Sequence, residues 1–191
     1  MAAGWLRRLF AQGSQPESQR DAAARDEAAA AAVTLVSDDP LSSLLSHAKL
    51  TLGMQLRAKG ITNPKVLHAM LDEVPRERFV IGSMVDRSYE DVTLPIGSGQ
   101  TISRPYIVAL MTQLLEPDST KTVLEIGTGC GYQAAVLSKL FSHVYSIERH
   151  SDLAETAEER LRQLDYTNVS VHFGDGFLGL PDLAPFDAII L

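Results

Sequence analysis

The spacing of apolar residues predicts helices in the first part of the chain. Over residues 41–117 apolar positions recur every three or four residues, which is typical of helices that bury one face. The first helix should end at Gly60, because glycine is favoured just past a helix end. The pattern predicts helices over 41–60, 65–74 and 105–117, with an extended, glycine-rich loop over 89–103.

A different pattern begins near Thr122, where short β-branched runs alternate with helical segments. Alternation at this spacing is typical of parallel strands joined by right-handed crossovers. The sequence therefore predicts an α/β protein with an open, doubly wound sheet. Its strands are predicted over 122–126, 143–147, 169–173 and 187–191, and its helices over 131–141 and 152–164.

Composition narrows the class of protein. The 191 residues, 45% of them hydrophobic, fit one domain, which we predict over 41–191, with a disordered or frayed helical extension over 1–40. The formal net charge of −7 argues against a nucleic-acid or membrane partner, and no run approaches the roughly 20 apolar residues of a membrane span. The single Cys130 excludes an internal disulfide and favours a reducing, cytoplasmic location. We predict no metal site, because the histidines lack ligand spacing.

The loop "EIGTGCG" after the first predicted strand is the first sign of a ligand. In a doubly wound sheet, ligands bind where that strand turns into its helix. A nucleoside triphosphate would need a lysine and a different spacing, and a dinucleotide would need a glycine where Tyr132 stands. The loop instead has glycines at 127, 129 and 131, with the acid Glu125 two residues before the first.

Acidic residues follow the next two strands. Glu148 lies roughly 20 positions after Gly127, the spacing at which an acid binds ribose hydroxyls. Asp175 and Gly176 end the third strand, where they could contact an adenine ring. Glycine also serves ordinary turns, and Glu148 alone could be a solvated charge. Together, however, these features favour a nucleoside without phosphate, such as S-adenosylmethionine, with Glu125 ordering the loop or binding the amino end of that ligand through water.

Three stretches closely resemble the protein-L-isoaspartate O-methyltransferase family, which repairs proteins that contain isoaspartate. They are "VLHAMLDEVPRERFV", "LPIGSGQTISRPYIVALMTQLLE" and "VLEIGTGCGYQAAVL". The resemblance runs from about Leu50 to the last residue, and "GQTIS" before a proline is a specific marker within it. It implies S-adenosylmethionine as cofactor and isoaspartyl proteins and peptides as substrates.

The same resemblance implies the roles of individual residues. Ser103 would be the catalytic serine, although a serine before Pro105 could equally cap the following helix. Arg104 stands where many relatives have a small or amide residue, which could alter substrate preference. Cofactor and cleft contacts are implied at Thr101, Ile102, Gly127, Thr128, Gly129, Gly131, Glu148, Arg149, Asp175 and Gly176.

The family's sheet has seven strands, so the resemblance also leads us to expect a truncated domain whose C-terminal strands are missing. The chain should then stop inside the fourth strand, which lies beside the first and has an unpaired outer edge. We expect Ile189, Ile190 and Leu191 to be exposed as a result, and the chain to be poorly stable and weakly active or inactive.

The implied methyl transfer needs few catalytic groups. A carboxylate with a pKa of roughly 3.5 to 4.3 is ionised at neutral pH, so no general base has to remove a proton before it attacks a methyl group. Ser103 would position that carboxylate by a hydrogen bond. Three alternatives remain: a methyltransferase for a small molecule or RNA, an inactive adenosyl-binding fragment, and, with least support, an NAD oxidoreductase.

Overall fold

The computed structural model describes residues 39–191, so the expected N-terminal extension lies almost wholly outside the described residues. The chain divides into two units, Met1–Ser43 and Leu44–Leu191. The sheet, its flanking helices and the glycine loop all belong to the second unit.

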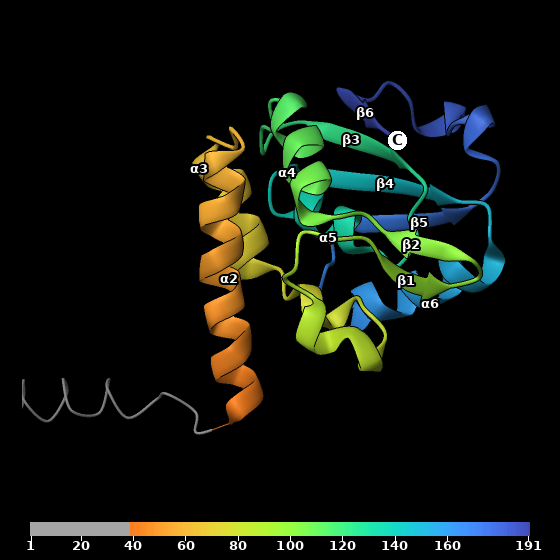
Figure 1. Cartoon of the computed structure of the whole chain (residues 1–191). Coiled ribbons are helices and arrows are strands. Elements are labelled where there is room, and N and C mark those ends of the chain that lie inside the picture. Colours follow the sequence, from red (N-terminus) through yellow and green to blue (C-terminus); the bar gives the residue numbers. More distant parts are fainter. Residues whose placement is uncertain (1–38) are drawn as a thin grey trace, which may run out of the picture. The chain divides into compact units, whose positions relative to one another are not determined.

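Four parallel strands form the central sheet in the order β5-β4-β3-β6. Figure 1 shows them as a stack with β6 at the top and β5 at the bottom. The order reverses at β3, because β4 and β5 lie on one side of it and β6 on the other. This is the predicted doubly wound arrangement, and the predicted fold class is confirmed. The strands are β3 (Thr122–Ile126), β4 (His143–Glu148), β5 (Val169–Phe173) and β6 (Ala188–Ile190).

Helices α5 (Tyr132–Ser138) and α6 (Ser151–Gln163) make the crossovers after β3 and β4. The first is shorter than predicted and is buried at every position except Gln133. Val123 and Val144 face each other in register and are fully buried, which is where β-branched residues suit a sheet. The buried pairing of β3 and β4 therefore fixes the positions of their carboxyl ends.

The predicted N-terminal helices are present as α2 (Pro40–Ala58), α3 (Pro64–His68) and α4 (Pro105–Leu114). The chain leaves α2 through Gly60, at a φ of +90° that favours glycine. Asn63 caps α3 by accepting hydrogen bonds from the N–H groups of Lys65 and Val66. Instead of continuing as an α-helix, α3 widens into a π-helical turn, η1 (Ala69–Glu73). Two 3₁₀ turns follow, η2 (Arg76–Arg78) and η3 (Gly82–Arg87).

The prediction of an extended loop over 89–103 is wrong in part. This stretch contains an antiparallel hairpin of β1 (Leu94–Gly97) and β2 (Gln100–Ile102). Ser98 and Gly99 have φ values of +50° and +68°, so they form a tight two-residue turn of the type that matches strand twist. Pro95 obscured the strand in the sequence, because proline is tolerated only at sheet edges and bulges, and this hairpin is bulged there.

The outer edge of β6 is unpaired among the described residues, as expected, since this strand pairs with β3 alone. Ile189 and Leu191 are 54% and 81% exposed, but Ile190 is only 3% exposed. The expectation that all three side chains would be exposed is therefore wrong for Ile190. Side chains alternate along a strand, and Ile190 shares the core face with Val123. Between β5 and β6 lie only two short 3₁₀ turns, η4 (Gly176–Leu178) and η5 (Pro181–Leu183).

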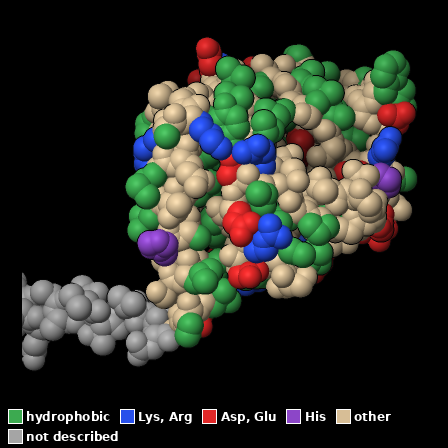
Figure 2. Space-filling view, viewed as in Figure 1, with side chains coloured by type: hydrophobic (Ala, Val, Ile, Leu, Met, Phe, Trp, Pro, Cys, Tyr) green, Lys and Arg blue, Asp and Glu red, His purple; other side chains and the backbone are tan. Residues whose placement is uncertain are grey.

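The surface of the described part gives no sign of a membrane span. Over residues 39–191, no helix has the length and apolar content needed to cross a bilayer, and no group of three or more His, Cys, Asp or Glu side chains could hold a metal ion. On the face shown in Figure 2, basic and acidic side chains are interspersed.

Candidate active site

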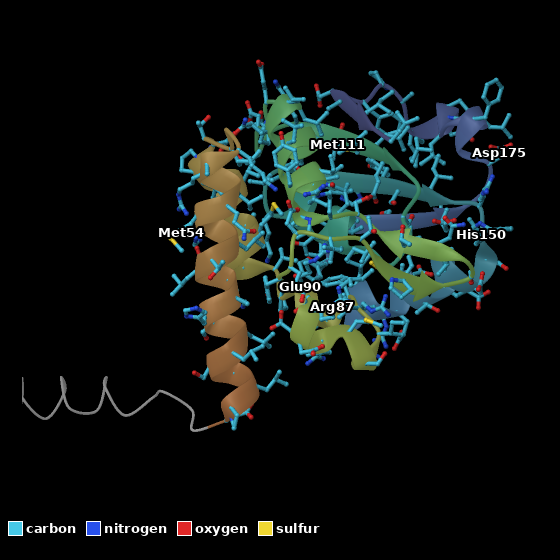
Figure 3. All side chains as sticks on the ribbon, viewed as in Figure 1. Met54, Arg87, Glu90, Met111, His150 and Asp175 are labelled. Atoms are coloured by element: carbon cyan, nitrogen blue, oxygen red, sulfur yellow. The ribbon has the colours of Figure 1, made fainter. Side chains whose placement is uncertain are left out.

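A cleft of about 410 Å³ opens at the carboxyl ends of β3, β4 and β5, where the strand order reverses. Figure 3 shows His150 and Asp175 at this end of the sheet. Seven of the predicted cofactor residues line the cleft together: Thr101, Gly127, Gly129, Glu148, Arg149, Asp175 and Gly176. Its remaining wall includes residues that the sequence did not single out, namely Ile96, Gln100, Ile126, Ile147, His150 and Phe177.

The glycine loop leaves β3 in a conformation that L side chains rarely adopt. Gly127 has a φ of +97°, and its N–H donates a 2.7 Å hydrogen bond to the carbonyl of Ile147. Gly131 lines neither this cleft nor the smaller cavity beside it, which is described below. A side chain there would meet Leu161 of α6 at 3.2 Å, so the residue allows α5 and α6 to pack closely. We assign Gly131 a packing role on this contact.

Glu148 at the end of β4 ties the loop to the next strand. Its Oε2 accepts a 2.8 Å hydrogen bond from the N–H of Gly129, and its Oε1 accepts a 3.0 Å bond from the N–H of His150. The side chain is 5% exposed, yet it borders the cleft. A carboxylate has about four acceptor positions, so two remain for a pair of ligand hydroxyls. The structure thus adds a loop-anchoring role to the predicted ligand contact.

Glu125 lies behind the loop and is not among the residues that line the cleft. Its Oε2 accepts a hydrogen bond from Ser146, whose hydroxyl is 2.6 Å from that of Thr128. Burial raises the pKa of Glu125 to about 8; the Ser146 bond opposes this shift and the nearby charge of Glu148 adds to it. Of the two roles left open by the sequence, this geometry favours ordering the loop.

The raised pKa makes stability depend on pH. Between the ordinary glutamate pKa and about 8, Glu125 holds its proton in the folded protein and loses it in the unfolded chain. The free energy of unfolding should therefore be highest below that window and fall, by a few kcal/mol, as pH rises through about 8. Urea unfolding of wild type and Glu125→Gln at pH 5, 7 and 9 checks this. The glutamine variant should lose much less stability across the series, and equal losses would contradict the assignment.

A second cavity, of about 70 Å³, adjoins the cleft, with which it shares Thr101, Gly127 and Gly129. Ser103 lines it, and so do two other predicted residues, Ile102 and Thr128. The Ser103 hydroxyl bonds to no residue within 39–191. The interpretation of Ser103 as a helix cap is wrong, because Arg104 occupies the N-cap position of α4 and the first-turn N–H of Tyr106 is bonded by Asp91. The hydroxyl is thus available to a ligand.

Comparison with known proteins identifies the family. A model of the family "Protein-L-isoaspartate(D-aspartate) O-methyltransferase (PCMT)" matches residues 47–191. The chain belongs to this family. It is 55% identical over 141 residues to the protein-L-isoaspartate O-methyltransferase of Yersinia enterocolitica, covering 74% of this chain and 67% of that one. It is 50% identical over 151 residues to protein-L-isoaspartate O-methyltransferase 1 of Geotalea uraniireducens, a match that covers 79% of this chain and 68% of that one.

Solved structures of the same family share the fold. A protein-L-isoaspartate O-methyltransferase superposes with a TM-score of 0.66 at 31% identity, covering 74% of this chain and 47% of that one. A Plasmodium falciparum protein, described as a candidate protein-L-isoaspartate O-methyltransferase and solved with S-adenosyl-L-homocysteine, superposes with a TM-score of 0.62 at 23% identity. The match covers 73% of this chain and 71% of that one. The chain spans about two thirds of the length of these curated relatives and about half of the first solved structure.

Next to Ser103, Arg104 is held by Asp91. The Asp91 Oδ2 atom accepts 2.6 Å bonds from both Arg104 and Lys59, and its Oδ1 accepts a 2.8 Å bond from the N–H of Tyr106. Burial alone would raise the pKa of Asp91, but the bonds from Arg104, Lys59 and Tyr106 outweigh it and hold that pKa well below its usual range. Arg104 thus helps to fix the backbone next to Ser103. An effect of Arg104 on substrate preference stays a prediction.

Gly176 offers a steric test of the cleft wall. A methyl group added there would lie 2.3 Å from the Cγ2 atom of Ile126, which also lines the cleft. We expect Gly176→Ala to lower the free energy of unfolding by about 1–3 kcal/mol and to weaken cofactor binding, because the wall must shift. Chemical unfolding and calorimetric titration measure the two effects. The control is Gly82→Ala, since nothing lies within 4 Å of a methyl group at that position. Wild-type stability and affinity in the Gly176 variant would contradict the described packing.

Proposed function

We propose that this chain transfers the methyl group of S-adenosylmethionine to the carboxylate of L-isoaspartyl residues in damaged proteins and peptides. One observation carries the proposal. The glycine loop, Glu148 and Asp175 come from three successive strand ends and border one cleft, and the cavity beside it contains the free hydroxyl of Ser103. Membership of the isoaspartyl methyltransferase family supports the same reaction.

In this proposal the cleft takes the adenosine part of the cofactor. Glu148 accepts hydrogen bonds from the ribose hydroxyls, while Asp175 and the N–H of Gly176 meet the adenine. The Asp175 side chain is held for this role, because it accepts a 3.0 Å bond from the N–H of Phe177. The sulfur end of the cofactor then lies toward the 70 Å³ cavity, which brings the methyl group to Ser103.

When bound, the cofactor would supply an electrophilic methyl group on a cationic sulfonium, and transfer of that group would leave the carbon–sulfur electron pair on sulfur. The residues of the chain need only align an ionised carboxylate oxygen with that carbon. Ser103 donates a hydrogen bond to the acceptor and fixes its direction. Orientation in a closed site can supply on the order of 7–11 kcal/mol, which suits a site without an acid–base pair.

The substrate and setting follow from the same chemistry. The acceptor is an isoaspartyl protein or peptide, and the negative net charge of the chain disfavours nucleic acid and anionic membranes. The free thiol of Cys130 is buried, and burial raises its pKa, so it is a poor nucleophile and fits a reducing cytoplasm.

Transfer of a labelled methyl group tests the proposal. The purified chain is incubated with labelled S-adenosylmethionine and an isoaspartyl peptide, beside a twin peptide that contains ordinary aspartate. We expect base-labile label on the isoaspartyl peptide only. Label on both peptides, or on RNA or a small acceptor instead, would point to another methyltransferase activity. Cofactor binding without transfer to any acceptor would show that this chain alone is an adenosyl-binding fragment.

A further inference from the structure

Arg76 is a fully buried cation that contacts residues of the 70 Å³ cavity. This cavity, which Ser103 lines, is called the acceptor cavity below because the proposed function places the acceptor there. Arg76 begins η2 and has no exposed surface. Its Nη2 donates a 2.9 Å hydrogen bond to the carbonyl of Ser103, and its Nε donates a 2.7 Å bond to the carbonyl of Ser88. The guanidinium carbon lies 4.6 Å from the centre of the Tyr132 ring. Ser103 and Tyr132 both line the 70 Å³ cavity, so Arg76 supports two of its sides.

The guanidinium of Arg76 has no carboxylate in direct contact among residues 39–191. Within the same residues, its buried Nη1 has no hydrogen-bond partner. The neighbouring Glu77 carboxylate does not pair with the guanidinium; it accepts a hydrogen bond from the hydroxyl of Tyr89, which itself accepts a 3.1 Å bond from the backbone N–H of Arg76. An unpaired buried charge normally costs several kcal/mol. A buried cation with a spare donor is therefore costly for folding alone, whereas it complements an anionic ligand.

We propose that Arg76 is the positioning residue of the acceptor cavity: it fixes the Ser103 backbone and gives the cavity the positive potential that selects an ionised carboxylate. This inference rests on the proposed function, which supplies the anionic acceptor. The two contributions act on different constants. The bond to Ser103 holds the hydroxyl in line and acts on kcat. The charge attracts the carboxylate before the reaction and no longer attracts the neutral ester, so it lowers the KM of the acceptor and favours product release.

Two substitutions separate these contributions. Arg76→Lys keeps the charge and the aliphatic stem but cannot reach the carbonyls of Ser88 and Ser103 with one planar fork. Arg76→Met removes the charge as well. The matched controls are Arg78→Lys and Arg78→Met, because Arg78 lies in the same turn and is exposed. For each variant, kcat and KM are measured with the isoaspartyl peptide, S-adenosylhomocysteine affinity by calorimetry, and folding by circular dichroism.

We expect Arg76→Lys to lose about 10-fold in kcat with the peptide KM nearly unchanged, because the bond from the charged guanidinium to the Ser103 carbonyl is lost. Arg76→Met should also raise that KM by about 10-fold or more, because the positive charge near the cavity is removed. Cofactor affinity should stay within about threefold in both, and the Arg78 variants should behave as wild type. A wild-type KM in Arg76→Met, or losses of cofactor affinity that match the losses of turnover, would overturn the proposal. So would a failure of both Arg76 variants to fold, because Arg76 would then be structural. Failure of the proposed function is distinguishable, since it appears as absent methylation by the wild type.

Discussion

Replacement of Ser103 by alanine is expected to reduce kcat for an isoaspartyl peptide by about 100-fold or more, while cofactor affinity changes less than about threefold. The hydroxyl lines the small cavity and bonds to no residue within 39–191, so its loss removes a donor from the acceptor without disturbing the fold. The cofactor itself is bound mainly in the adjoining cleft. Turnover should therefore suffer far more than binding.

Steady-state kinetics and calorimetric titration with S-adenosylhomocysteine measure these two effects separately. Ser142→Ala is the control, since Ser142 is exposed, precedes β4 at the opposite end of the sheet, and its hydroxyl donates one hydrogen bond, to the carbonyl of Lys121. That variant should keep wild-type turnover. Equal losses of turnover and cofactor affinity in Ser103→Ala would contradict the account in which the cleft binds the cofactor and the 70 Å³ cavity positions the acceptor.

Glu148→Ala is expected to weaken cofactor binding by about 100-fold or more, since hydrogen bonds to a charged group contribute roughly 1.5–3 kcal/mol each. Two ligand bonds would be lost. The N–H groups of Gly129 and His150 would also lose their acceptor, so the glycine loop would no longer be held against β4. The measurement is the dissociation constant of S-adenosylhomocysteine, with chemical unfolding to report the loop.

Graded variants make this result specific. Glu148→Gln keeps one acceptor oxygen and should fall between wild type and alanine in affinity. Glu158→Ala removes an exposed carboxylate from α6 and should leave affinity unchanged. If Glu148→Ala bound the cofactor as wild type does, the placement of the ribose at the end of β4 would have to be abandoned.

The sequence predicted the sheet because its strands carry local signals. Val123 and Val144 belong to short β-branched runs that are typical of buried parallel strands, and the glycines after β3 mark where the next helix begins. The residues that border the cleft were predictable for the same reason. Glu148 and Asp175 directly follow strands, and the carboxyl ends of parallel strands meet at one edge of the sheet.

Features that depend on contacts distant in sequence were not predictable. The sequence left two roles open for Glu125, and only the contact of its side chain with Ser146 behind the loop favours the ordering role. Arg76 lies in a stretch that resembles the family but was not singled out, because its contact with Ser103, 27 positions later, depends on how the segment after η1 folds back. The hairpin of β1 and β2 was missed, since Pro95 and the two glycines favoured a loop in any local reading.

The central claim is that a cofactor lies at the carboxyl edge of the sheet with its sulfur directed at Ser103. A crystal structure of the chain with S-adenosylhomocysteine tests this most directly. We predict that the ribose hydroxyls lie within hydrogen-bond distance of Glu148, the adenine beside Asp175, and the sulfur toward the cavity that Ser103 lines. A cofactor bound elsewhere, with neither Glu148 nor Ser103 in reach, would contradict the account.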